Sequence, residues 1–138
     1  MISPRLALAV MLVLPAATSA ADFAKCNPSG SQLEMTACAV DDFKQADSEL
    51  NEVYKAVLVK EGSNKAFAQK LRAAQRAWLA FRDAELDAMY ACDNENQASC
   101  WGSMLPLCRS SYMAGLTRNR THRLRELLIE GPPADKCQ

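Results

Sequence analysis

The sequence predicts an all-α fold: an up-down-up bundle of three long helices with short connecting loops, stapled by disulfides. Over long stretches, apolar side chains recur at the three-and-four spacing of a helix face. Start and stop signals divide these stretches into three segments, and no convincing alternation indicates a β-strand. A chain of 138 residues, 49% of them hydrophobic, suffices for one domain with a sizeable core.

Residues 1–20 have the pattern of a secretory signal peptide. Arg5 stands ahead of an unbroken apolar run that ends at Leu14, and small residues suited to cleavage follow. The run is too short to cross a bilayer, which takes about 20 apolar residues. We therefore expect residues 21–138 to form a single exported domain with a short C-terminal tail and no membrane anchor, located in the periplasm or secreted.

The first helix is expected from Gln32 to Lys60. Ser31 and Glu34 have the spacing of a capping box at its start, and Gly62 follows its end as a stop signal. On a helical wheel the apolar residues of this segment share one side, whereas most of its acids share the other. The pattern predicts a helix that buries one face and exposes an acidic one.

Two further helices follow. The second is expected over Lys65 to Tyr90, and a polar loop flanked by cysteines comes after it. The third starts near Ser103, tolerates Pro106 in its first turn, and stops at Gly131. The apolar positions that define the second helix are Phe67, Leu71, Ala74, Trp78, Phe81 and Ala88.

Six cysteines lie in the expected mature domain: Cys26, Cys38, Cys92, Cys100, Cys108 and Cys137. An even number of cysteines in a small exported domain indicates disulfides. Their spacings match no zinc-binding pattern, so no metal is expected. We predict three structural disulfides, or two and a spare thiol.

The placement of the cysteines favours some pairings. Cys38 points away from the apolar stripe of its helix and toward the segment of Cys26, which favours a Cys26–Cys38 bond. The short loop mildly favours Cys92–Cys100. Cys137 lies too far down the chain for an extended tail to reach Cys108. Either the tail folds back, or the third helix ends early, or Cys137 is unpaired or intermolecular.

Two charged residues lie on the apolar face of a predicted helix: Asp47 on the first helix and Arg120 on the third. An unpaired buried charge is costly, so each needs a partner. Both lie at a similar depth from the same end of the bundle, because each is about fifteen residues into its helix. We predict a structural Asp47–Arg120 ion pair that fixes helix register, with Gln75 of the second helix close enough to join it.

Composition excludes several function classes. The 16 basic and 16 acidic residues give a net charge of zero, unlike the marked basic excess of a nucleic-acid binder. The chain has one histidine, and it contains no phosphate-binding loop, dinucleotide fingerprint or haem-attachment motif. We expect a protein that is not an enzyme and that carries no cofactor.

Short clusters of residues follow one another along the predicted helices in a specific order. They are Cys38-Ala39, Ala46-Asp47-x-x-Leu50-Asn51-x-x-Tyr54, Gln75-Arg76-x-Trp78-x-x-Phe81-Arg82-Asp83-x-Glu85, Gly102-Ser103, Cys108, and Leu116-Thr117-x-x-Arg120-x-x-x-Leu124. In order and spacing they resemble the domain of LprI-type lysozyme inhibitors, a group of exported bacterial proteins, over nearly the whole mature chain.

The resemblance implies an all-helical, disulfide-bonded envelope domain that inhibits lysozyme, and we expect it to act by occluding the enzyme's cleft. This chain departs from the family in two ways. Leu86 stands where the family often has a cysteine, and the chain has additional cysteines at Cys92, Cys100 and Cys137. The family's disulfide pattern is therefore not transferred to this chain. The alternative from a different class is a non-enzymatic envelope interaction or stress module without lysozyme inhibition.

A basic lysozyme is the expected partner, because an acidic surface steers the encounter with a basic enzyme. Between Gln32 and Tyr54 the chain has six acids and one lysine. The zero net charge is therefore a cancellation between an acidic first helix and a basic third helix, on which Arg118 and Arg125 should face water. The candidate partner-binding residues are Glu34, Asp41, Asp42, Glu49 and Glu52.

Overall fold

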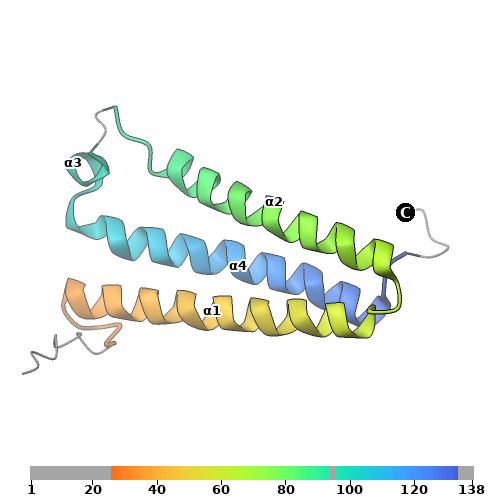
Figure 1. The fold of residues 1–138 in the computed structure, drawn as a ribbon. Coiled ribbons are helices and arrows are strands. Elements are labelled where there is room, and N and C mark those ends of the chain that lie inside the picture. The colour runs from red at the N-terminus through yellow and green to blue at the C-terminus, as the bar shows by residue number, and fades with distance from the viewer. Residues whose placement is uncertain (1–25, 94–95, 134–138) are drawn as a thin grey trace, which may run out of the picture.

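The computed structural model describes residues 26–93 and 96–133. Three long helices run up, down and up, as α1 (Gln32–Lys60), α2 (Lys65–Met89) and α4 (Leu105–Glu130). A short helix, α3 (Gln97–Trp101), and a 3₁₀ turn, η1 (Gly102–Met104), join α2 to α4. Figure 1 shows this order, and the described ranges contain no strand. The predicted all-α class is confirmed.

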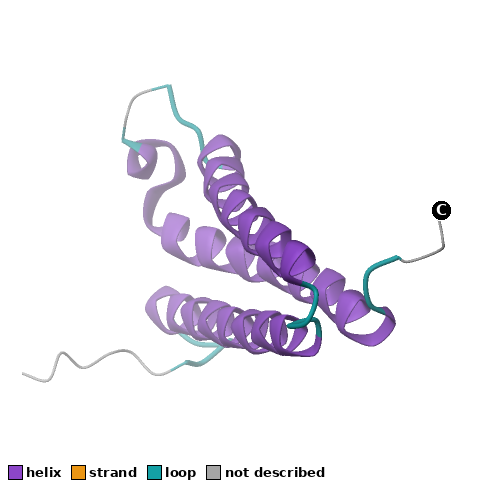
Figure 2. Ribbon diagram, turned by 45° about the vertical axis from the view of Figure 1, so that its right-hand side comes forward, coloured by secondary structure: helices purple, strands orange, loops and turns teal. Residues whose placement is uncertain are grey.

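Helices α1 and α4 lie side by side, whereas α2 is inclined to them. In Figures 1 and 2, α2 meets the pair near its start and diverges toward α3. Small buried residues such as Ala46 and Ala114 lie where α1 packs against α4, and they let the two helices approach closely. Leu50, Val57, Leu71 and Leu124 form the core where the three helices converge.

Local signals account for the ends of the helices. The Ser31 hydroxyl accepts a bond from the Glu34 backbone N–H, and the Glu34 carboxylate accepts one of 2.8 Å from the Ser31 N–H. The Asn64 side chain caps α2 by accepting a 3.0 Å bond from the Phe67 N–H. Gly131 ends α4 with a φ of 76°, which glycine adopts without a steric penalty.

The predicted boundaries differ from the observed ones in two places. The second helix ends at Met89, one residue before the predicted end. The third was expected near Ser103, but that residue belongs to η1 and α4 begins at Leu105, with Pro106 in its first turn. The short helix α3 was not predicted. Residues 1–20 and Cys137 lie outside the described residues.

Two disulfides staple the described chain. Cys26–Cys38 ties the N-terminal segment to α1, with the two Cα atoms 4.4 Å apart. Cys92–Cys100 closes the loop that carries α3. Both match the favoured pairings, and Cys108 is a half-buried free thiol. Within the described ranges, no helix combines the length and apolar character that a bilayer crossing requires.

Candidate functional site

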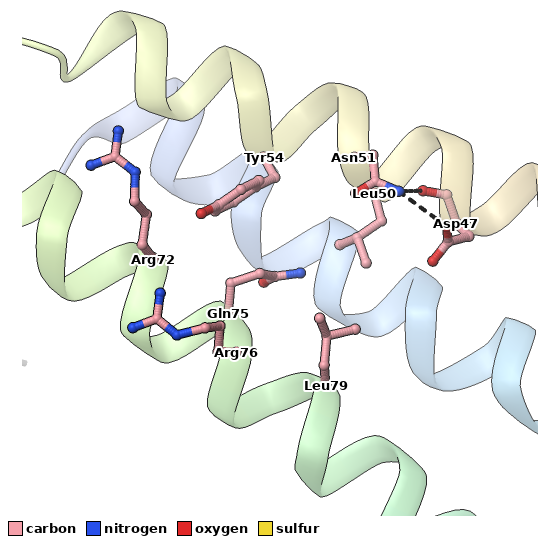
Figure 3. Close-up of a pocket in the computed structure, with 8 residues that line it drawn as sticks. All are labelled: Asp47, Leu50, Asn51, Tyr54, Arg72, Gln75, Arg76 and Leu79. Carbon is pink, nitrogen blue, oxygen red and sulfur yellow. Dashed lines mark hydrogen bonds between the residues drawn. The ribbon is translucent and has the colours of Figure 1, made fainter.

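A cavity of about 290 Å³ lies between α1 and α2 (Figure 3). On each helix the lining residues follow the i, i+3, i+4, i+7 pattern of a single helix face, so each helix contributes one face. The cavity is therefore a product of the inclination of α2, which leaves space beside α1. Its lining residues are Asp47, Leu50, Asn51, Tyr54, Arg72, Gln75, Arg76 and Leu79.

The cavity gathers residues from two of the sequence clusters. Asp47, Asn51 and Tyr54 belong to the cluster on the first helix, and Gln75 and Arg76 begin the cluster on the second. Sequence reasoning placed these residues on helix faces but did not predict that the two faces enclose a cavity. The sequence did contain a signal that α2 carries unpaired positive charge. The helix has several basic residues but no acid before Asp83 that could pair with them.

Gln75 and Arg120 meet at the inner wall of the cavity. Gln75 is only 7% exposed, and its Oε1 accepts a 3.0 Å bond from Arg120 Nε. Burial lowers the pKa of the Arg120 guanidinium from its ordinary value, the neighbouring Arg123 lowers it further, and Tyr54 opposes both. The expected proximity of Gln75 and Arg120 is therefore present, and the half-buried arginine has an oriented polar partner.

Asp47 does not pair with Arg120, which corrects the sequence prediction. Its Oδ1 lies 3.8 Å from Arg82 Nη1, and its Oδ2 accepts a 3.0 Å bond from Asn51 Nδ2. The Asp47 side chain is 41% exposed, so it is not the buried charge that the wheel suggested. Asp47 therefore joins α1 to α2 rather than α1 to α4.

Depth along the bundle explains the correction. Measured from the end where the helices converge, Gln75 lies ten residues after Lys65 and Arg120 ten residues before Glu130. Both are roughly 15 Å from that end, whereas Asp47, thirteen residues before Lys60, is roughly 20 Å from it. A long helical side chain leans toward the N-terminus of its helix. The guanidinium of Arg82 on α2 therefore reaches back to the level of Asp47.

Arg82 is the most enclosed charge on α2. Its guanidinium stacks between the rings of Phe43 and Trp78, at 5.7 and 5.4 Å from their centroids. Its Nη2 lies 2.9 Å from Asp83 Oδ1, and Nε donates to the same oxygen at 3.0 Å. Together with Asp47, these contacts fix one end of the cavity wall.

The candidate partner-binding acids of α1 have different environments. The carboxylate of Glu34 serves the capping box, which lowers its pKa through bonds from the Ser31 backbone and side chain. Asp41 pairs with Lys44 on its own helix at 3.2 Å. Glu52 is exposed, and it has no ionic partner within the described part of the chain.

Asp42 and Glu49 form ion pairs that sequence analysis missed. Arg118 of α4 donates to both carboxylate oxygens of Asp42, and Arg125 donates to Glu49. These arginines were expected to face water, and both are nearly half exposed, but each also reaches an acid of α1, because α4 lies against α1 and a long side chain spans the contact between the two helices. The four side chains remain 41–48% exposed, so each pair adds at most about 1 kcal/mol of stability.

A second, open groove of about 560 Å³ lies beside the Cys26–Cys38 disulfide. Asp41 and Asp42 line it from α1, and Leu107 lines it from the start of α4. The groove thus places two of the candidate acids beside a hollow in the surface. Across residues 26–93 and 96–133, no three His, Cys, Asp or Glu side chains gather as metal ligands.

Comparison with known proteins identifies the family of this chain. The family model described as lysozyme inhibitor LprI matches residues 24–124. An uncharacterised protein of Rhizobium meliloti (strain 1021) is 34% identical over 114 residues, which cover 75% of this chain and 78% of that protein. No solved structure matches the chain. Since the family match spans α1, α2 and most of α4, the chain belongs to the LprI lysozyme inhibitor family.

Proposed function

We propose that the protein is an exported inhibitor that binds a lysozyme and occludes its cleft. The observation that carries the proposal is the family match over residues 24–124, which includes the cavity and the acidic side of α1. Residues 1–20 act as the signal peptide, and residues 21–138 work as one domain in the periplasm or outside the cell. Inhibition by steric occlusion requires no catalytic group on the inhibitor.

The docking surface in this proposal is the acidic seam, defined as Asp41, Asp42, Glu49 and Glu52. These carboxylates lie along α1, a helix of 29 residues and roughly 43 Å, which is long enough to lie across an enzyme cleft. The groove beside Asp41 and Asp42 offers a hollow for a protruding basic side chain. Glu34 is left out because its carboxylate is engaged in the capping box.

The ion pairs limit how strongly the seam attracts a basic enzyme. Its four carboxylates face Lys44, Arg118 and Arg125, which leaves a net charge of about −1. Electrostatic steering is therefore weaker than the sequence count suggests. Affinity has to come from direct contacts, in which a lysine or arginine of the enzyme competes for the exposed side of each carboxylate.

A lytic assay tests the function, with lysis of bacterial cells followed with and without the purified protein. Dose-dependent inhibition of an animal-type or a goose-type lysozyme is expected. Unchanged lysis at excess protein with both classes would contradict the proposal and favour an envelope module without inhibitory activity.

Variants test the acidic seam separately. Asp41→Asn combined with Glu52→Gln should weaken inhibition about tenfold, because two exposed carboxylates are lost without breaking a pair between helices. Asp93→Asn combined with Glu130→Gln removes the same charge from exposed positions elsewhere and should leave inhibition unchanged. Equal effects of the two double variants would reject the seam as the docking surface. Equal affinity in dilute and concentrated salt would reject steering by it.

A further inference from the structure

Arg72 and Arg76 differ from the other arginines that the structure describes. Neither makes an ion pair or a hydrogen bond within the described chain, and both line the cavity between α1 and α2. They stand four residues apart on α2, a spacing at which like charges repel. Each remaining described arginine contacts a carboxylate or an amide: Arg82, Arg109, Arg118, Arg120, Arg123 and Arg125.

Gln75 adds an oriented donor to the wall of the cavity. Because an arginine Nε can only donate, its bond to Gln75 fixes the side-chain oxygen toward Arg120. The Gln75 Nε2 amide is then left with no partner among the described residues. In Figure 3 this nitrogen points between the helices toward Leu50 and Leu79, away from the guanidinium groups of the two arginines. Solvent reaches Nε2 itself, because it is not one of the buried polar side-chain atoms without a partner in the described residues, so a ligand in the cavity can accept its bond.

The two ends of the cavity differ in charge. In Figure 3 both arginine side chains and the Tyr54 hydroxyl lie toward one end, and Asp47 lies toward the other. The Asp47 carboxylate already has Arg82 and Asn51 as partners. The first end therefore presents the unpaired positive charge of two arginines and the free Tyr54 hydroxyl, with the half-buried Arg120 behind Gln75.

We propose that this cavity binds the oxyanion of a small acid, either a carboxylate or a phosphate. The planar guanidinium groups of Arg72 and Arg76 suit such an oxyanion, because each presents paired N–H donors. The Tyr54 hydroxyl supplies a further donor at the same end of the cavity, and Gln75 Nε2 supplies one nearer to Leu50 and Leu79. Leu50 and Leu79 form an apolar wall for a compact ligand body. The volume of about 290 Å³ lies at the small end of ligand pockets.

Nuclear magnetic resonance titration of the ¹⁵N-labelled, disulfide-bonded exported protein tests the proposal. The readout is the side-chain amide of Gln75, which lies in the cavity wall. The probes are benzoate, inorganic phosphate, and benzamide as the neutral match for benzoate. We expect saturable shifts with at least one anion and at least tenfold weaker binding of benzamide. Tighter binding of benzoate assigns the site to carboxylates with an apolar body, and tighter binding of phosphate assigns it to phosphates.

Charge variants provide the matched control. Arg72→Gln combined with Arg76→Gln should weaken anion binding at least tenfold, and both positions are exposed and unpaired, so the fold should persist. Lys65→Gln combined with Lys70→Gln removes the same charge from α2 outside the cavity and should change affinity less than twofold. The proposal is overturned by the absence of saturable shifts with either anion, by equal binding of benzoate and benzamide, or by equal effects of the two double variants.

Discussion

Replacing Asp47 and Arg82, singly and together, measures the interaction that holds α1 beside α2 at the cavity. The variants are Asp47→Asn and Arg82→Gln, which remove charge while keeping side-chain size. A double-mutant cycle isolates the coupling between the two side chains from the other contacts that each one makes. A second cycle, with Asp47→Asn and Arg120→Gln, measures the alternative pairing.

The geometry sets the expected magnitude. At 3.8 Å and an effective dielectric constant of about 20, two unit charges attract by about 4 kcal/mol. The 41% exposure of the Asp47 side chain and the competing contact of Arg82 with Asp83 screen most of this attraction. We expect a coupling of about 1 kcal/mol, at the upper end for exposed pairs. Arg82→Gln alone should cost about 2 kcal/mol, because it also loses the two ring contacts.

Urea unfolding followed by far-ultraviolet circular dichroism gives the free energies. The Asp47–Arg120 cycle should show a coupling below about 0.4 kcal/mol, the range found for residues without direct contact. A larger coupling of Asp47 with Arg120 than with Arg82 would refute the assignment of Asp47 to the α1–α2 contact.

Three further predictions concern stability. Leu124→Ala should lower the free energy of unfolding by about 3 kcal/mol, because Leu124 is fully buried, whereas Ile129→Ala at a 78% exposed position should cost below about 0.5 kcal/mol in the same urea experiment. The pKa of Glu34 is lowered in the folded state, so its contribution is present above the ordinary value of 4.5 and is lost as the pH falls through the folded pKa. The difference in unfolding free energy between wild type and Glu34→Gln should therefore shrink between about pH 6 and about pH 3, and a constant difference would contradict this role. Replacing both Cys26 and Cys38 by serine should cost about 3 kcal/mol, since the bond closes a loop with a sequence separation of 12, and a cost near zero would show that the bond does not restrain the unfolded chain.

Local signals explain why the long helices were predictable. The capping box of Ser31 and Glu34 and the stop at Gly131 act within one helical turn, so the pattern alone locates those ends. Helix α3 has five residues, too few for a periodic pattern. It depends on the Asn96 cap and the Cys92–Cys100 bond, neither of which produces a periodic signal.

The candidate site could not be predicted from helical periodicity alone, because it depends on how the helices are placed relative to one another. A helical wheel assigns Asp47 and Gln75 to faces, but the inclination of α2 decides which residues are level across the gap. The wheel also did not show that Arg118 and Arg125 pair with acids of α1, because it locates where a side chain starts and not how far a long one reaches. Gln75 and Arg120 were brought together correctly because they are equally distant from the convergent end of the bundle.

Occlusion of the lysozyme cleft is tested most directly by hydrolysis of a soluble chitooligosaccharide, measured while the protein is titrated into the enzyme. A soluble substrate excludes effects that depend on binding to the cell wall. Occlusion predicts that hydrolysis falls in proportion to the protein added and approaches zero when the enzyme is saturated. Full hydrolysis at a large excess of protein, with both animal-type and goose-type enzymes, would contradict inhibition through the cleft.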